Sequence, residues 1–246
     1  TAEGGAPDAT VLGFGFKTNA MRAAYVNGAS MHVLDYEPMW LPANHALSTT
    51  LPAALAIAEV TGADGRHLVE ALVKGIEIQG WIREASEQWD PGALTLHPPG
   101  MVGPMSSAVA AGILLELTPR QLAHALGIAA SRAGSVLANA GTMTKCTHCG
   151  LATSLGLEAA QLAARNFDAN PQIFDDPRGY VGAYFPGLDP ERLLSFGPPW
   201  RVCEPGYAIK LFPSQFATHY AITAGLNLNA QLSRSGVTPE DVRKVT

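Results

Sequence analysis

The sequence predicts a mainly helical fold, and three observations favour this class. Apolar residues recur three or four positions apart over most of the chain, which is the spacing of one helix face. Proline, glycine and helix-capping residues separate these periodic stretches. Small residues four positions apart, such as Ala129 and Ala133, would let helix backbones approach closely. The helices are expected at residues 19–34, 48–60, 64–88, 101–115, 119–138, 144–166 and 215–233.

Local signals predict where these helices begin and end. Asn19 is a suitable N-cap for the first helix, which should end near Asp35 because Pro38 follows. Gly62 is a residue type that commonly ends a helix. Pro119 is suited to the first turn of the helix that it opens. The sequence therefore predicts separate helices joined by short, irregular segments.

The charge of the chain argues against several partners. Charged residues make up 15% of the sequence, against roughly 25% in typical soluble domains, which suggests closely packed helices and a buried subunit interface. The net charge is −5 and no run of lysine or arginine occurs, so neither nucleic acid nor an anionic membrane is an expected partner. The uncharged stretch 92–115 contains Pro98, Pro99 and Pro104, so it is not expected to span a membrane as a helix.

The three cysteines allow several interpretations. Cys146, Cys149 and Cys203 could hold an iron–sulfur cluster, and the first two could form a redox pair or part of a zinc site. One C-x-x-C motif is a weak signal, and small apolar helix residues are the favoured interpretation, with no metal. An odd number of cysteines forms no complete disulfide framework, so a cytoplasmic location is expected.

Polar residues gather at the ends of the predicted helices and in loops. Asp35 and His45 lie on one irregular segment, where they could act as an acid/base pair or as a capping aspartate and a surface histidine. His97 precedes two prolines at a helix start, a position that favours an anion such as a substrate carboxylate. Taken alone, His97 could equally be a turn residue without a role.

Two lysines occur next to helix starts. Lys145 and His148 open the helix 144–166, and a cation there gains nothing from the helix dipole, so a bound anion would explain it. Lys210 precedes the helix 215–233 in the same way. The alternative is that the lysines are solvated and the histidine is packed. Two lysines in such positions suggest that each binds one end of the same polycarboxylate.

These clusters, taken in order, resemble the MmgE/PrpD family, whose members include 2-methylcitrate dehydratase, cis-aconitate decarboxylase and iminodisuccinate epimerase. The order and spacing of the matching stretches fit along essentially the whole chain. They are Tyr25-Val26-Asn27-Gly28, His32-Val33-Leu34-Asp35-Tyr36-Glu37, His45 with Leu51-Pro52-Ala53 and Ala58-Glu59, Leu96-His97-Pro98-Pro99 with Gly103, Ala125-Leu126-Gly127-Ile128-Ala129, Thr144-Lys145 with His148-Cys149-Gly150, and Lys210-Leu211-Phe212-Pro213 with His219.

The resemblance implies a large all-helical domain followed by a smaller α+β lid domain, usually in a homodimer. Residues 1–207 would be the helical domain, with an N-terminal part missing, and 208–246 would be the truncated beginning of the lid. The chain starts at Thr1 without a methionine, which agrees with this expectation. The resemblance further implies a site between the domains that needs no cofactor.

The resemblance also assigns candidate site residues. The expected catalytic residues are Asp35, His45, His97 and Lys145. The expected substrate-binding residues are Met39, His148, Lys210 and Gln215. Met39 stands where the decarboxylases have a threonine, and Gln215 where they have a histidine, so substrate contacts are expected to differ at these two positions.

The predicted function is a cofactor-independent carbon–oxygen or carbon–carbon lyase that acts on a citrate-like di- or tricarboxylate. Dehydration and decarboxylation would both pass through a carbanion-like species. The alternative on the same scaffold is an isomerase or epimerase of a dicarboxylate such as iminodisuccinate. A second alternative is a non-catalytic homologue that binds carboxylates.

Overall fold

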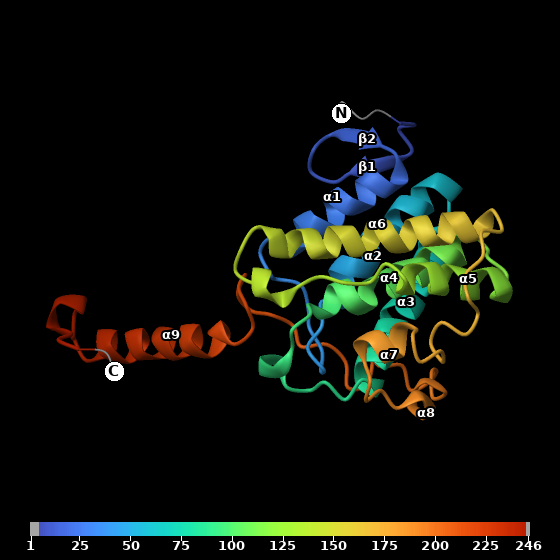
Figure 1. The fold of residues 1–246 in the computed structure, drawn as a ribbon. Coiled ribbons are helices and arrows are strands. Elements are labelled where there is room, and N and C mark those ends of the chain that lie inside the picture. Colours follow the sequence, from blue (N-terminus) through green and yellow to red (C-terminus); the bar gives the residue numbers. More distant parts are fainter. Residues whose placement is uncertain (1–4, 245–246) are drawn as a thin grey trace.

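The computed structural model describes residues 5–244, and this part of the chain is mainly helical (Figure 1). A short antiparallel hairpin, β1 (Ala9–Val11) and β2 (Phe16–Thr18), precedes the helices. The α-helices are α1 (Ala20–His32), α2 (Ala46–Thr61), α3 (Gly65–Ala85), α4 (Pro98–Leu114), α5 (Pro119–Ala130), α6 (Thr144–Ala164), α7 (Tyr180–Tyr184), α8 (Pro190–Leu193) and α9 (Thr218–Arg234). Short 3-10 turns are η1 (Pro91–Ala93), η2 (Leu137–Asn139) and η3 (Pro239–Asp241).

Helices α4 and α6 form the centre of the fold, and helices α1, α2, α3 and α5 pack around them (Figure 1). The buried residues between them are largely alanines, as the small-residue pattern predicts. Gly150 of α6 lies against the main-chain oxygen of Tyr25 in α1, and Gly156 lies against that of Pro104 in α4. A methyl group at either glycine would collide with backbone, so these two positions set how closely the helices approach.

Several predicted helix ends are confirmed. The side chain of Asn19 accepts a hydrogen bond from the third residue of α1, and Gly62 ends α2 with a left-handed φ of 70°. Pro119 lies in the first turn of α5. The helix predicted to reach residue 88 ends earlier, at Ala85.

The expectation that α5 reaches residue 138 is wrong, because the helix ends at Ala130. The residues that follow leave the helix and pair with the loop before α4 and with the first turn of α4. The N–H of His97 donates to the carbonyl oxygen of Ser135 at 2.9 Å, and the N–H of Gly134 donates to that of Gly100 at 3.0 Å. Pro104 has no N–H to offer the carbonyl of Gly100, so this acceptor is free for Gly134. Pairing outside the helix thus replaces the helical bonds and fixes the segment that carries His97.

The C-terminal segment leaves the helical body. The predicted helix at 215–233 is present as α9, which projects away from the other helices (Figure 1). Division of the chain at residue 207 stays a prediction. Among the described residues, no helix combines the length and apolar character that a membrane crossing requires.

Candidate active site

A cavity of about 190 Å³ lies beside the segment that joins α1 to α2 and the first turns of α4 and α6. Its walls come from five segments that lie far apart in the sequence. Six of the eight predicted site residues line it, namely Asp35, Met39, His45, His97, Lys145 and Gln215. The fold therefore gathers most of the predicted site in one place.

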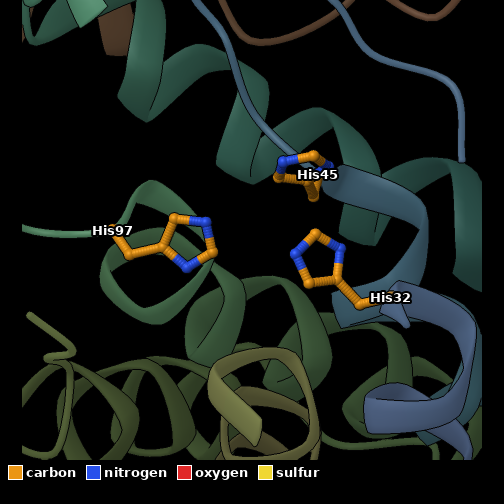
Figure 2. A group of neighbouring side chains, drawn as sticks. All are labelled: His32, His45 and His97. Atoms are coloured by element: carbon orange, nitrogen blue, oxygen red, sulfur yellow. The ribbon is translucent and has the colours of Figure 1, made fainter. Parts of the chain in front are cut away.

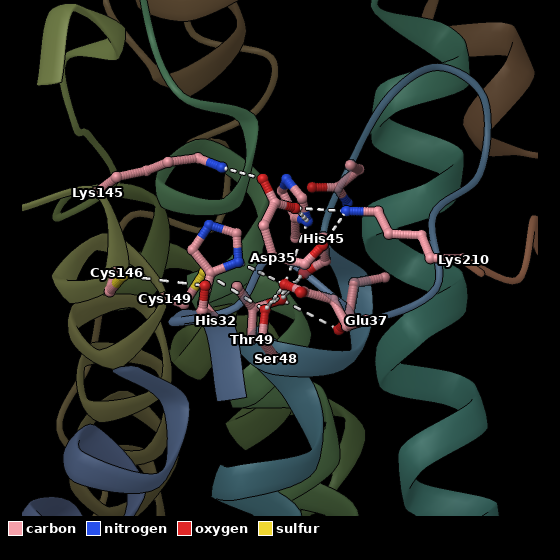
Figure 3. A network of polar contacts seen from close by, with 12 residues as sticks. His32, Asp35, Glu37, His45, Ser48, Thr49, Lys145, Cys146, Cys149 and Lys210 are labelled. Atoms are coloured by element: carbon pink, nitrogen blue, oxygen red, sulfur yellow. Dashed lines mark hydrogen bonds and ion pairs between the residues drawn. The ribbon is translucent and has the colours of Figure 1, made fainter. Parts of the chain in front are cut away.

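Asp35 is the centre of this site, between two lysines that approach from opposite sides (Figure 3). Nζ of Lys145 lies 2.7 Å from Oδ2, and Nζ of Lys210 lies 2.5 Å from Oδ1. Lys210 also donates to the main-chain oxygen of Asp35. Asp35 has a φ of 47°, a left-handed conformation that side chains other than glycine seldom adopt and that clusters at functional sites. Two ammonium groups thus converge on one carboxylate.

A second carboxylate, that of Glu37, lies below the first and binds two histidines. Its Oε1 atom lies 2.5 Å from Nδ1 of His32 and 3.1 Å from Nδ1 of His45. The hydroxyl of Ser48 donates to the same oxygen at 2.9 Å. All four side chains are buried, so Glu37 fixes the orientation of both imidazole rings.

His32 and Glu37 were absent from the predicted site. His32 falls on the apolar spacing of α1, where a histidine is usually a packed residue, and Glu37 lies in a proline-flanked turn. The available signal was the stretch from His32 to Glu37, which matches the family as a unit. Only the fold shows that both side chains point toward His45.

Three histidine rings face one another beside the carboxylates (Figure 2). The ring centres of His32 and His45 are 4.4 Å apart, and each lies 5.9 Å from that of His97. On its other side, Nδ1 of His97 lies 3.0 Å from Nδ1 of His148. In this hydrogen bond one nitrogen carries the hydrogen and donates, and the other is unprotonated and accepts. The tautomer of one ring therefore determines that of the other.

The lysines and histidines keep both carboxylates ionised. Burial raises the pKa of the Asp35 carboxyl, but nearby His45 and hydrogen bonds from the two lysines outweigh it and hold the pKa below its usual value. Burial acts on Glu37 in the same way, and hydrogen bonds from His32 and His45 lower its pKa far more strongly. Neither carboxylate is therefore a proton donor at neutral pH.

Burial opposes protonation of His45, His97 and His148. Burial, and then the charges of His45 and Lys145, lower the pKa of His97 to about 2. Burial also lowers the pKa of His45, although the bond to Glu37 opposes it, and burial lowers that of His148. At neutral pH His97 is therefore an uncharged imidazole.

The structure places two predicted substrate-binding residues away from the cavity wall. The Lys210 side chain is fully buried and its ammonium forms an ion pair with Asp35. Lys210 therefore contacts the Asp35 carboxylate and does not line the cavity. His148 contacts His97 and lines a separate cavity beside Ser135. Both act on the site through a neighbour in this structure, so their direct contact with substrate stays a prediction.

Comparison with known proteins identifies the family. The family model of the MmgE/PrpD N-terminal domain matches residues 1–193. This chain belongs to the MmgE/PrpD family.

Curated relatives of this MmgE/PrpD chain carry one activity in their names. Cis-aconitate decarboxylase of Mus musculus is 36% identical over 230 residues, which cover 92% of this chain and 46% of the relative. The Homo sapiens protein of the same name is 35% identical over 215 residues, covering 85% and 44%. That of Aspergillus terreus is 31% identical over 179 residues, covering 70% and 36%. The chain thus spans less than half the length of these relatives.

The cysteines of the MmgE/PrpD chain do not form a shared metal site. Within residues 5–244, the three sulfurs do not gather into a group that could hold one ion. Cys149 is buried and accepts from Ser48, and burial raises the pKa of its thiol well above the usual range. Cys203 is exposed. Cys149 therefore behaves as a small packed residue.

Two groups of side chains in the site are close enough together to bind one metal ion. Ligand atoms of His32, His45 and His97 lie within 4.8 Å of one another, as do those of His32, Asp35, Glu37 and His45. Geometry alone would allow a metal ion, but Glu37 and the lysine ammonium groups already occupy much of this donor set.

A larger cavity of about 310 Å³ lies beside Arg83 and Trp89. It contains none of the predicted site residues, and Arg83 within it is held by Gln88. A large volume is not by itself evidence of a catalytic site. The smaller cavity at Asp35, which six of the predicted site residues line, is therefore the candidate active site of this MmgE/PrpD chain.

Proposed function

We propose that the protein is a lyase that acts on a citrate-like di- or tricarboxylate without a cofactor. The observation that carries this proposal is the convergence of Lys145 and Lys210 on Asp35, beside His45 and His97 in the wall of the same cavity. The relatives named cis-aconitate decarboxylase support decarboxylation of such an acid as the reaction.

Lys145 is the residue best placed to bind a substrate carboxylate. It lines the cavity, and its ammonium is shared with Asp35 at 2.7 Å. An entering carboxylate would find a cation already held in place, which requires little reorganisation. Preorganised charge of this kind usually contributes most to stabilising a negative charge that develops during a reaction.

His97 is the proposed proton carrier. A substrate carboxylate beside it would oppose the charges of His45 and Lys145, and would therefore raise its pKa from about 2 toward working pH. In a dehydration, neutral His97 would take the proton from the carbon next to a carboxylate, the C–O bond would break as the double bond forms, and His97 would return the proton to the departing hydroxyl, which leaves as water. In a decarboxylation, loss of CO2 leaves an electron pair on carbon, and a protonated His97 would supply the proton that ends the reaction.

Asp35 and Glu37 have supporting roles in this proposal. Asp35 holds both ammonium groups, and Glu37 holds His32 and His45 in fixed orientations. Both carboxylates stay ionised, so they orient the cations and rings and do not move protons themselves.

The remaining expectations extend the proposal to the whole protein. Residues 208–246 would begin a smaller α+β lid that closes over the cavity, where Met39 and Gln215 already line the wall. The assembly would be a homodimer in the cytoplasm, as the resemblance and the odd number of cysteines suggest.

Product analysis tests the proposed function. The full-length protein would be incubated without added metal with cis-aconitate, 2-methylcitrate, citrate and iminodisuccinate, and proton NMR in D2O would follow each acid. Release of CO2 or water from one acid is the expected result and names the substrate. Deuterium exchange at one carbon without loss of either would instead favour an isomerase. Binding without any turnover would favour the non-catalytic homologue.

A further inference from the structure

Glu77 of α3 is a fully buried carboxylate outside the site described above. Its two oxygens accept hydrogen bonds from successive main-chain N–H groups, Arg201 to Oε2 at 3.0 Å and Val202 to Oε1 at 2.7 Å. A buried carboxylate is costly unless its oxygens are satisfied, and here irregular backbone satisfies them. Glu77 therefore ties residues 201–210, which we call the strap, to the helical core.

Aromatic side chains hold the strap at two further points. The guanidinium of Arg201 lies 5.6 Å from the ring centres of both Trp40 and Trp81. Tyr207 stacks on Trp40 with ring centres 4.9 Å apart and an interplanar angle of 7°. Gly80 faces the Trp40 ring, and any side chain at this position would collide with it. The strap is thus packed against the loop that carries Asp35.

The end of the strap is paired with the same loop. The N–H of Ala208 donates to the carbonyl oxygen of Met39 at 2.7 Å, and the N–H of Met39 donates to that of Ala208 at 3.1 Å. Two residues later, Lys210 reaches Asp35. A continuous series of bonded contacts therefore runs from Glu77 through the strap to the carboxylate at the centre of the site.

We propose that Glu77 is a positioning residue of the active site, which fixes the strap and thereby holds Lys210 against Asp35. The proposal rests on the proposed function, because it takes the Asp35 cavity to be the polycarboxylate site. Without the two hydrogen bonds at Glu77, the strap would loosen and Lys210 would no longer fix Asp35. The position of Lys145 would then vary as well, since Asp35 also binds that lysine.

The test is a double-mutant cycle on the full-length protein, with tricarballylate as an inert tricarboxylate probe and calorimetry as the measurement. Glu77→Gln keeps the shape of the side chain but offers one acceptor oxygen to two N–H groups. It is expected to weaken binding by about tenfold, the effect of losing one hydrogen bond to a charged group. Lys210→Ala should weaken binding at least as much. Glu77→Gln added to Lys210→Ala should cause no further loss, because both changes act through the same contact.

Glu70→Gln is the matched control. Glu70 lies on the same helix and pairs with the exposed ammonium of Lys74 at 2.6 Å, away from the strap. Its loss should leave affinity within about twofold, as expected for an exposed ion pair. Tyr207→Leu supplies a second variant that leaves the Glu77 bonds intact, in case Glu77→Gln does not fold. It should weaken binding in the wild type and not in the Lys210→Ala background.

Hydrogen exchange of the peptide spanning 201–210 gives a readout that needs no ligand. Exchange should be faster in Glu77→Gln and unchanged in Glu70→Gln. Wild-type affinity in Glu77→Gln, or losses that add fully in the double variant, would overturn the positioning role while leaving the proposed function intact. Failure of the wild type to bind or convert any polycarboxylate would contradict the proposed function instead. Exchange would then decide the role of Glu77, and an unchanged rate in Glu77→Gln would overturn it.

Discussion

The ammonium of Lys145 lies 2.7 Å from the carboxylate of Asp35, although 110 residues separate the two in the sequence. Both side chains are only 16% exposed, so the pair is shielded from water and retains much of its electrostatic strength. The contact joins the loop after α1 to the start of α6 and places a cation at the wall of the cavity.

The pH dependence of turnover should differ between the free and the substrate-bound enzyme. In the empty site the pKa of His97 is lowered to about 2, so kcat/KM should show no acid limb from this residue in the accessible range. A bound carboxylate raises that pKa, so kcat should show an acid limb at higher pH if His97 acts as the base of a dehydration, and a basic limb if protonated His97 supplies the proton of a decarboxylation. Pre-steady-state and steady-state profiles, corrected for ionisation of the substrate, measure both limbs. Profiles of kcat and kcat/KM that change at the same pH would contradict the role of His97.

Glu37→Gln should destabilise the fold in a pH-dependent way. At pH 7 the loss should be about 1–3 kcal/mol, the cost of leaving buried hydrogen-bond partners unsatisfied. Because the pKa of Glu37 lies below its unfolded value of 4.5, its ionised form contributes stability above that pH and loses it as the pH falls further. The difference from wild type should therefore narrow below about pH 4.5 in urea titrations. The exposed Glu116 provides the control substitution to glutamine, and an equal effect there would refute the assignment.

Met39 and Gln215 should control substrate choice. Both line the cavity, and both differ from the residues that the decarboxylase resemblance implies. Met39→Thr combined with Gln215→His should raise kcat/KM for cis-aconitate relative to the native substrate by about tenfold, the worth of one additional hydrogen bond. Met39→Leu serves as the control for a change of shape alone. An unchanged ratio would show that these positions do not contact the substrate.

Removal of all three cysteines should leave the reaction intact. Serine at Cys146 and Cys203 and alanine at Cys149 should retain activity within about twofold, since none of the three is needed for the proposed chemistry and Cys149 is a packed thiol. Turnover and iron content by elemental analysis would be measured together. Loss of activity accompanied by loss of bound iron would support an iron–sulfur cluster held by the cysteines.

The sequence predicts local features of this fold better than long-range ones. Caps at Asn19 and Gly62 are local, because their hydrogen bonds lie within a few residues, and both predictions are confirmed. The end of α5 at Ala130 was missed because it depends on pairing with the distant loop at His97. Propensity favoured a longer helix, and tertiary hydrogen bonds prevailed.

The site shows the same limit. Spacing alone does not bring Asp35 together with Lys145 and Lys210, and only the family resemblance placed them in one site. His32 and Glu37 escaped notice because a histidine on an apolar helix face and a glutamate in a turn have ordinary structural explanations. Their roles depend on which buried partners they contact, and this becomes visible only in three dimensions.

The most direct test of the central claim is the turnover of Lys145→Ala and His97→Ala in the full-length protein, measured with the acid that product analysis identifies. Each variant should lose about 100-fold to 1,000-fold in kcat, the usual effect of removing one preorganised catalytic group, while circular dichroism and thermal unfolding show an intact fold. Turnover close to wild type in either folded variant would contradict the assignment of the Asp35 cavity as the catalytic site.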